Sequence, residues 1–466
     1  MTIKELFAPS DMTVGKPWEK IVAFTIPMLI GNIAQQLYNT VDSIVIGKYV
    51  GDNALAAVGS ASPILNLLLV LFVGISVGAG VMVSQYFGAR QRKELSMTIG
   101  NCVTLTAISS IIIMILGAVL SRPLLEMLKT PDSIIDWCTS YLVILMVGCA
   151  GSAYYNILCG ILRGLGDSIS ALIYLLVATV INIVLDAVFV LGFHWGMYGA
   201  AAATVIGQVI SAIIAVCYLS HYRTVTLHSG HFRPNASHLA QICSLGMASA
   251  INQVAMMIVQ ITMNNLLKHY GAQSVYGESI PIACSGIVMK VNQLYFSVII
   301  GLSQGSQPIQ SFNYGAKQYN RVKESYRLAI TVGAIVSIVS FLLFQIFPRQ
   351  ILGLFGSGSK EYFDFGVNYF RIFLLFTWLN FMQPISSTFF SSIGKAYKGT
   401  FLSLTRQILF LLPLLLLFPR FWGIKGILYA SPVADVLSFA VGLAMVIHEF
   451  QLIRKLEVSE QNTTTF

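Results

Sequence analysis

The chain has 466 residues, of which 56% are hydrophobic and 10% are charged, and its formal net charge is +9. This composition excludes a soluble protein, because a soluble domain of this length needs more charge on its surface. The basic residues follow the loops and form no patch with interleaved aromatic residues, which excludes a nucleic-acid partner. The seven cysteines include no CxxC pair, and no nucleotide-binding loop or catalytic constellation occurs, so we expect a membrane protein that is not an enzyme.

Apolar stretches separated by polar breaks recur along the whole chain. About 20 apolar residues cross the hydrocarbon core of a bilayer, and by this measure the stretches predict twelve spans. In chain order the predicted spans are 20–47, 55–85, 96–120, 135–158, 168–193, 196–220, 239–268, 279–311, 325–347, 363–391, 397–419 and 426–450. The expected fold is an all-α membrane protein with twelve transmembrane helices.

The loops between the predicted spans differ in charge. With twelve crossings, most of the Lys and Arg residues lie at the termini and in the even-numbered loops, as in Arg90-Gln-Arg-Lys93. The positive-inside rule then places both termini and these loops in the cytoplasm, with the chain in the inner (plasma) membrane. The polar start of the chain lacks a cleavage signal, so the first span is expected to act as an uncleaved signal anchor.

The two halves of the sequence resemble each other. Tyr86-Phe-Gly-Ala-Arg90 aligns with Asn313-Tyr-Gly-Ala-Lys317, and Gly196 aligns with Gly423 at the same shift. Six spans per half is an even number, so the repeat is parallel and predicts two six-helix bundles. The predicted domains are an N-terminal lobe (1–222), a cytoplasmic linker (223–237), a C-terminal lobe (238–450) and a cytoplasmic tail (451–466).

Two acids interrupt predicted spans of the N-terminal lobe. A carboxylate in hydrocarbon is costly and marks a functional site by default. From the topology and a rise of about 1.5 Å per residue, the polar residues at one depth near the outer side of the lobe are Asp42, Asn182, Asp186 and Thr204. Their oxygens suit a hard cation such as Na⁺, and a desolvated carboxyl can also take up a proton reversibly. The alternative is that these groups only join helices through hydrogen bonds.

A polar stripe follows one face of the first predicted span, and a similar stripe follows the seventh. Such stripes face water or protein rather than lipid. They predict a substrate cavity lined by Gln36, Asn39, Asn252, Gln253, Met256, Gln260 and Asn264. Packing between the lobes is the alternative interpretation. Pro27 removes a helix hydrogen bond within the first span and predicts a bend there, as a hinge or as a static kink.

The C-terminal lobe carries a different set of charges. Thr262 stands where the repeat places Asp42, and the seventh span contains no acid. Lys290, Arg406 and Asp435 lie near mid-depth of three other spans and form a candidate charge cluster with two cations against one anion. A structural ion pair is the first interpretation, because an unpaired buried charge is costly. The surplus cation could instead meet an anionic substrate.

The order and spacing of these motifs resemble the multidrug and toxic compound extrusion (MATE) family of secondary transporters. The resemblance is carried by Pro27 to Asp42, Gln85-Tyr-Phe-Gly-Ala-Arg90, Arg163-Gly-Leu-Gly-Asp167, Asn182-Ile-Val-Leu-Asp186, Gly199-Ala-Ala-Ala-Ala-Thr204 and Gly315-Ala-Lys317. Within the family the chain is similar to the bacterial DinF-like branch, which implies a cation-coupling site at Asp42, Asn182, Asp186 and Thr204. The branch named for norfloxacin export has an acid in the seventh span, where this chain has Gln253 and Gln260. No cation site is therefore expected in the C-terminal lobe.

The resemblance implies alternating access around a central cleft and export of amphipathic, often cationic or aromatic compounds in exchange for H⁺ or Na⁺. No cofactor is expected, and Na⁺ is the only metal considered. The expected partners are small-molecule substrates and membrane lipids, and a monomer is expected. The alternative is a flippase for a lipid-linked oligosaccharide or another anionic amphiphile. Lys290 and Arg406 favour the flippase, whereas the acidic N-terminal lobe and the twelve spans favour the exporter.

Overall fold

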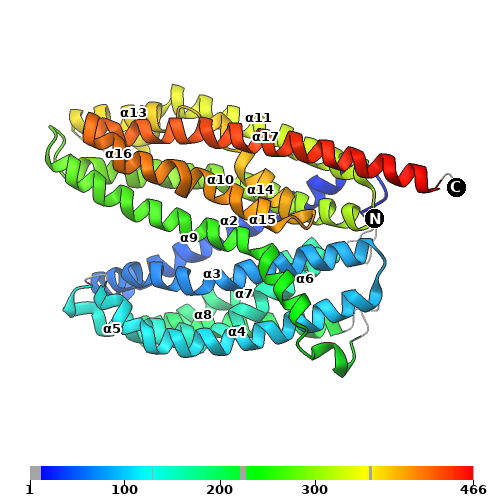
Figure 1. Cartoon of the computed structure of the whole chain (residues 1–466). Helices are drawn as coiled ribbons and strands as arrows, with labels where there is room; N and C mark the ends of the chain where they lie inside the picture. Colours follow the sequence, from blue (N-terminus) through cyan, green and yellow to red (C-terminus); the bar gives the residue numbers. More distant parts are fainter. Residues whose placement is uncertain (1–11, 128–129, 221–226, 356–358, 465–466) are drawn as a thin grey trace. The chain divides into compact units, whose positions relative to one another are not determined.

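The computed structural model describes residues 12–127, 130–220, 227–355 and 359–464, and it describes the backbone alone for residues 36–44, 47, 52, 53, 55, 56, 220 and 458–464. Throughout this part of the chain the regular secondary structure is helical (Figure 1). A helix satisfies its backbone hydrogen bonds within its own segment, as a chain surrounded by hydrocarbon requires. The hydrocarbon core of the bilayer therefore accounts for both the apolar composition and the helical architecture of the chain.

Six spans come from the first half of the chain. They are formed by α2 (Pro17–Tyr49), α3 (Asp52–Gly88), α4 (Arg92–Met127), α5 (Asp132–Val147) with α6 (Cys149–Gly164), α7 (Ser168–Asp186) with the π-helical η1 (Ala187–Gly192), and α8 (Gly196–Ser220). The pair α5 and α6 is long and apolar enough to cross a membrane together, and it bends by 49° at the break between the two helices. A side chain on Gly148, at this bend, would meet Val205 of α8 within 2.3 Å. The bend therefore lies where the fourth span packs tightly on α8.

Six further spans come from the second half. They are formed by α9 (Ala236–Ala272), α10 (Ser279–Gly315), α11 (Tyr319–Ile346), α13 (Lys360–Phe373) with the 3-10 helix η3 (Thr377–Leu379) and α14 (Met382–Ser392), α15 (Ala396–Leu404) with the π-helical η4 (Thr405–Leu411) and α16 (Leu412–Trp422), and α17 (Ile424–Thr464). Two short helices, η2 (Ser229–Phe232) and α12 (Pro348–Phe355), lie between spans.

The helices follow the spans predicted from the sequence. In the described residues, nine helices are long and apolar enough to cross a membrane, and the α5–α6 pair makes a tenth. The helix α2 and the broken segment from α13 to α14 occupy the two remaining predicted spans, and the all-α membrane fold is confirmed. The features that were not predicted include the short α12 and the continuation of α17 as a helix into the expected tail. A 2.6 Å ion pair between Lys323 and Glu457 ties this extension to α11.

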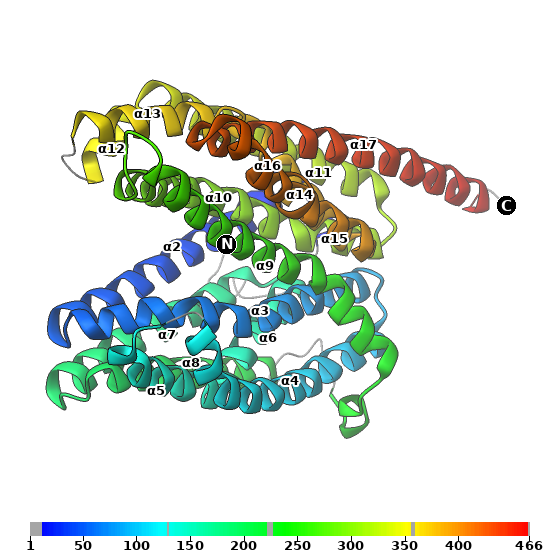
Figure 2. The same ribbon diagram turned by 60° about the vertical axis from the view of Figure 1, so that its left-hand side comes forward.

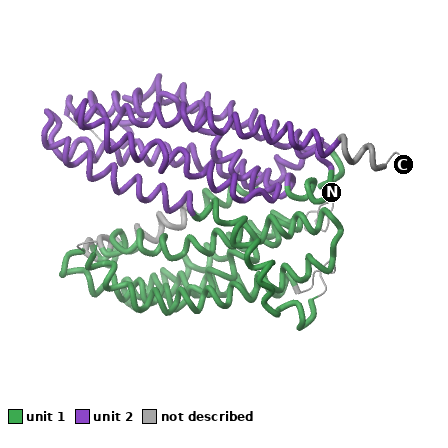
Figure 3. The backbone as a smooth tube through the Cα atoms, viewed as in Figure 1, with its two compact units in different colours: residues 1–15, 26–250, 311–317 green, residues 16–25, 251–310, 318–466 purple. Residues whose placement is uncertain are grey.

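The chain forms two compact units with interleaved boundaries (Figure 3). Unit 1 comprises residues 1–15, 26–250 and 311–317, and unit 2 comprises residues 16–25, 251–310 and 318–466. The helices α2, α9 and α10 therefore contribute residues to both units. The lobes predicted from the sequence follow the membrane spans instead and stay a prediction.

Small residues join α3 to α6 in unit 1. Ser84 Oγ donates to the carbonyl oxygen of Gly164 at 3.0 Å. One turn away, a side chain on Gly80 would stand 3.0 Å from the carbonyl oxygen of Gly160. In a bilayer the lipid is as apolar as the helix surfaces, so close packing and interhelical hydrogen bonds hold helices together. Here serine provides the interhelical hydrogen bond, and glycine, one turn away, allows the close packing.

Within unit 2, the helices α11, α13 and α17 lie side by side (Figures 1 and 2). The Tyr326 hydroxyl of α11 lies 2.7 Å from Ser386 Oγ of α14, and its ring packs against Phe389. The fully buried Glu449 of α17 pairs with Lys395 and with Lys398, which lies 2.6 Å away. These contacts fix the turn between α14 and α15 on α17.

Candidate functional site

The antiparallel neighbours α7 and α8 approach closely in unit 1. Ser211 Oγ donates to a carbonyl oxygen of α7 at 2.7 Å. One turn further along α8, a side chain on Gly207 would stand 3.1 Å from the carbonyl oxygen of Ala178. Another turn along, Thr204 meets Asn182. Hydroxyl and glycine residues on one face of α8 thus bring the polar groups of both helices into contact.

The three polar groups form one hydrogen-bonded cluster. Both amide atoms of Asn182 find partners when Nδ2 donates to Asp186 Oδ2 at 3.0 Å and Oδ1 accepts from the Thr204 backbone nitrogen and hydroxyl at 3.1 and 3.2 Å. In the reversed orientation Nδ2 donates to Thr204 Oγ1 at 3.2 Å, and Oδ1 turns toward the carboxylate. Asn182 and Asp186 are 2% and 1% exposed, so the cluster is desolvated. One turn of α7 separates the amide from the acid.

A π-helical turn follows the acid. Asp186 is the last residue of α7, and η1 begins at Ala187. Single π-helical turns within α-helices are rare and frequently occur at functional sites. The segment from Ser168 to Asp186 contains neither proline nor glycine, so the sequence of α7 gives no indication of the π-helical turn that follows it.

The structure brings Asn182, Asp186 and Thr204 together, and their predicted role in binding a cation stays a prediction. The fourth predicted residue, Asp42, lies in α2, but its side chain is outside the described part of the chain. The same holds for the predicted cavity residues Gln36 and Asn39. Their contribution to a site stays a prediction.

Pro27 is buried inside α2, and the helix continues past it to Tyr49. The described backbone is helical on both sides of the proline. The predicted role of this residue as a bending point remains a prediction.

The glycine-rich segment before α7 is a tight turn. Gly166 has φ of 91°, in the region that favours glycine. The next residue, the buried Asp167, caps α7 by accepting from the Ser170 backbone nitrogen at 3.0 Å and hydroxyl at 2.7 Å. The Tyr218 hydroxyl of α8 also donates to this carboxylate at 2.8 Å. Asp167 is thus an acid with a structural role, and the N-cap pattern Asp-x-x-Ser is its sequence signal.

The helix α9 carries the other predicted cavity residues. Gln253 and Asn264 are exposed, and Gln260 Nε2 donates to Asn264 Oδ1 at 3.0 Å. Asn252 Nδ2 lies 4.0 Å from the sulfur of Met256. In the same part of α9, the buried side chains are the apolar Ala255, Val259, Met263 and Leu267. The polar stripe is therefore separate from the packed face, and its role as a cavity lining stays a prediction.

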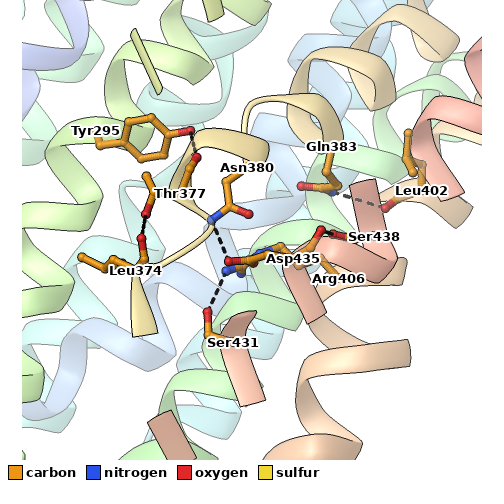
Figure 4. Close-up of polar contacts among 10 residues, drawn as sticks. All are labelled: Tyr295, Leu374, Thr377, Asn380, Gln383, Leu402, Arg406, Ser431, Asp435 and Ser438. Atoms are coloured by element: carbon orange, nitrogen blue, oxygen red, sulfur yellow. Dashed lines mark hydrogen bonds and ion pairs between the residues drawn. The ribbon is translucent and has the colours of Figure 1, made fainter. Parts of the chain in front are cut away.

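Unit 2 contains a buried ion pair (Figure 4). Arg406 Nε of η4 donates to Asp435 Oδ1 of α17 at 2.8 Å, and the two side chains are 7% and 0% exposed. Arg406 also donates to Ser431 Oγ at 3.4 Å, and Asn380 donates to Asp435 Oδ2 at 3.3 Å. At the shift that aligns Gly196 with Gly423, Ser431 corresponds to Thr204 of unit 1.

The same polar core contains the break between α13 and α14 (Figure 4). Thr377 Oγ1 donates to the Leu374 carbonyl oxygen at 2.8 Å, and the Tyr295 hydroxyl donates to the Thr377 carbonyl oxygen at 3.3 Å. Interrupted helix at membrane depth is stable only where protein or water satisfies the backbone. The sequence reading missed this break because residues 374–381 contain neither proline nor glycine. The sequence signal for this break is the presence of two polar residues, Thr377 and Asn380, among aromatic residues.

Lys290 takes no part in this ion pair. It is exposed on α10, and in the part of the chain that the structure describes it makes no ion pair or hydrogen bond. The two cations and one anion predicted for this half therefore divide into an arginine paired with the acid and a lysine with no ion-pair partner among the described side chains.

Comparison with known families identifies the family of this chain. The MatE family model matches residues 27–188 and 248–417. The chain belongs to the MatE family. A relative named probable multidrug resistance protein YoeA, from Bacillus subtilis (strain 168), is 27% identical over 346 residues, which cover 72% of this chain and 73% of the relative. Multidrug export protein MepA from Staphylococcus saprophyticus is 21% identical, covering 91% and 92% of the two chains.

Solved structures of MATE transporters share this fold over 96–98% of the chain. One, described as MATE in the bent conformation, has a TM-score of 0.89 at 22% identity and covers 98% of this chain and 100% of its own. Another, described as an outward-facing multidrug resistance MATE family transporter of the MOP superfamily, has a TM-score of 0.87 at 23% identity and covers 96% and 99% of the two chains. The predicted architecture of twelve helices in two bundles is confirmed by this likeness.

Proposed function

We propose that this protein is a cation-coupled antiporter that exports amphipathic, often cationic or aromatic compounds by alternating access. Membership of the MatE family and similarity to proteins named for multidrug resistance and multidrug export support efflux of drugs and toxic compounds. The proposed location is the inner membrane, with both termini in the cytoplasm, on the basis of the charge of the loops.

The observation that carries the coupling is the buried contact between Asn182 and Asp186 beside Thr204. Carboxylate, amide and hydroxyl oxygens are ligands of a hard cation, and a desolvated carboxylate also has a raised affinity for protons. A buried acid on a membrane helix is costly and is retained where it has a function. The proposed site is completed by Asp42 of α2.

The amide of Asn182 offers a way to respond to a cation. With Nδ2 toward Asp186 it neutralises part of the carboxylate charge through a hydrogen bond. With Oδ1 toward Asp186, the amide and carboxylate oxygens face each other, while Nδ2 donates to Thr204 Oγ1 at 3.2 Å. A cation between these two oxygens would favour this orientation. In the proposed cycle, arrival of the cation reverses this amide and favours one conformation of the transporter.

Coupling between ion and substrate must be reciprocal. Each can affect the other only through a difference in its affinity for the outward-facing and inward-facing states. In the proposal, a cation entering from outside favours the state that releases the exported compound. Release of the cation to the cytoplasm then restores the state that binds the compound from inside.

The decisive test is Asp186→Asn, which preserves size and removes the charge. Ethidium efflux is measured in cells and in proteoliposomes under an imposed H⁺ or Na⁺ gradient. We expect efflux to fall to the level without transporter, while the amount of folded protein in the membrane is unchanged. The gradient that drives the wild-type protein identifies the coupling ion.

The matched control is Asp136→Asn, an exposed carboxylate of α5 whose side chain is 75% exposed. This control should keep wild-type efflux, because its carboxylate is solvated. Undiminished efflux from Asp186→Asn under either gradient would refute the coupling role of the cluster.

A further inference from the structure

The candidate charge cluster of unit 2 contains one acid and two cations. Its acid, Asp435, is paired with Arg406 at 2.8 Å and is fully enclosed. Lys290 is the only charged residue of α10 and has no ion-pair or hydrogen-bond partner in the described residues. Of the two cations in this cluster, the lysine is therefore the one without the acid, and it lies on an exposed surface rather than in the core.

Lys290 belongs to a distinct face of α10. Five positions spaced by three and four residues lie on one side of the helix, and they are Ala283, Gly286, Lys290, Gln293 and Ser297. The first four are exposed and Ser297 is partly buried. The opposite side is packed and contains Pro281, Cys284, Ser285, Val288, Tyr295 and Ile299. The helix thus presents one face of small and polar residues, with the exposed Leu294 at its edge, and packs the other face into unit 2.

The composition of this face indicates what it meets. A lysine and a glutamine on a lipid-facing surface are costly, so in membrane helices they face the protein interior or a water-filled cavity. Lysine can reach an interface by extending its long side chain, but Gln293 lies one turn further along α10 and has a shorter side chain. Gly286 and Ala283 leave space beside the ammonium group. The exposed face therefore fits the wall of an aqueous cavity with one positive charge.

We propose that Lys290 binds the acidic group of an organic anion carried by this transporter, such as a carboxylate, sulfonate or phosphate on an apolar body. The inference rests on the proposed transport function and names a substrate class for it. The ammonium group would form a charge-assisted hydrogen bond with the acidic group. Exposed apolar side chains near it, including Leu294 at 65% exposure, would contact the apolar body.

The test compares two xanthene dyes of opposite charge in proteoliposomes under the driving gradient. Carboxyfluorescein is the anionic probe, and rhodamine 6G is the cationic probe. Labelled phosphatidylglycerol, assayed for movement between leaflets, distinguishes a lipid anion from a soluble anion. The variant is Lys290→Gln, with Lys290→Arg as the charge-preserving variant. Lys425→Gln, which removes an exposed lysine from the start of α17, is the matched control.

We expect the wild-type protein to move carboxyfluorescein or the labelled lipid. In Lys290→Gln, transport of that anion should fall about tenfold to a hundredfold, which corresponds to the loss of one hydrogen bond to a charged group. Rhodamine 6G transport should not fall in this variant, and both Lys290→Arg and Lys425→Gln should retain anion transport. The anion that depends on Lys290 identifies the source of the substrate.

Three outcomes overturn the inference. If rhodamine 6G is moved but neither anion is, the substrate class is wrong and the proposed function stands. If Lys290→Gln lowers transport of both dyes equally, or of neither, the lysine has a structural or interfacial role instead. If the wild-type protein moves none of the probes under any gradient, the proposed function fails together with the inference.

Discussion

Each unit contains a buried acid and a π-helical turn, and the two acids have different partners. Asp186 of unit 1 ends α7 directly before η1 and contacts the amide of Asn182. Asp435 of unit 2 contacts the guanidinium group of Arg406, which lies within η4. The two units thus place similar irregular helices beside different chemistry.

This difference separates a fixed charge from an exchangeable one. A guanidinium group carries a permanent charge, and it holds the Asp435 carboxylate in one place because breaking a buried pair leaves an uncompensated ion. An amide carries no charge and offers either a donor or an acceptor to the same neighbour. The π-helical turn therefore does not by itself mark an ion site, and the partner of the acid decides its role.

The largest expected effect comes from breaking the fixed pair. Arg406→Met should lower the free energy of unfolding by about 3–5 kcal/mol, because it leaves Asp435 buried without its cation. Thermal unfolding in detergent measures this loss. Asp186→Asn, by contrast, should unfold close to the wild-type temperature.

A double variant sharpens the same comparison. Arg406→Met combined with Asp435→Leu removes both charges and should recover most of the lost stability, since an apolar pair needs no desolvation of ions. If Arg406→Met is as stable as the wild type, the pair does not fix unit 2 and the contrast between the two acids is wrong.

A smaller effect is expected where α7 and α8 approach. Gly207→Ala places a Cβ atom 3.1 Å from the Ala178 carbonyl oxygen and 3.5 Å from Asn182 Cβ. The two helices must separate slightly, at a cost of about 1–3 kcal/mol. We expect a raised cation concentration for half-maximal efflux, measured by titrating the driving ion. Gly230→Ala, where no atom lies within 4 Å, is the control. If both variants need the same cation concentration for half-maximal efflux, the distance between α7 and α8 does not determine the affinity of the cation site.

The smallest effect is expected from Thr204→Val, which keeps the shape of the side chain and removes its hydroxyl. The Asn182 amide then loses one of its hydrogen bonds, while the Thr204 backbone nitrogen remains a partner. A loss of about 1 kcal/mol corresponds to a severalfold weaker apparent cation affinity. The same ion titration of efflux measures it. A complete loss of transport would place Thr204 at the centre of the site instead of at its edge.

The positions of the helices could be predicted from the sequence because each is set by local composition. A run of about 20 apolar residues must form a helix in a bilayer, whatever surrounds it. The pairing of Asn182 with Asp186 is also local, since one helical turn separates them. The break at Thr377 could not be predicted in this way, because it is stabilised by Tyr295 of another helix.

The sequence by itself determined the helical fold, the repeat and the candidate acids, because hydrophobicity and helical periodicity act within each segment. Only the tertiary structure decided which groups neutralise which charges. Asp435 lies 29 residues after Arg406, on the next span, and has its carboxylate 2.8 Å from the guanidinium group, whereas Lys290 is left exposed. An ion pair depends on distance in space, and helix packing alone sets that distance.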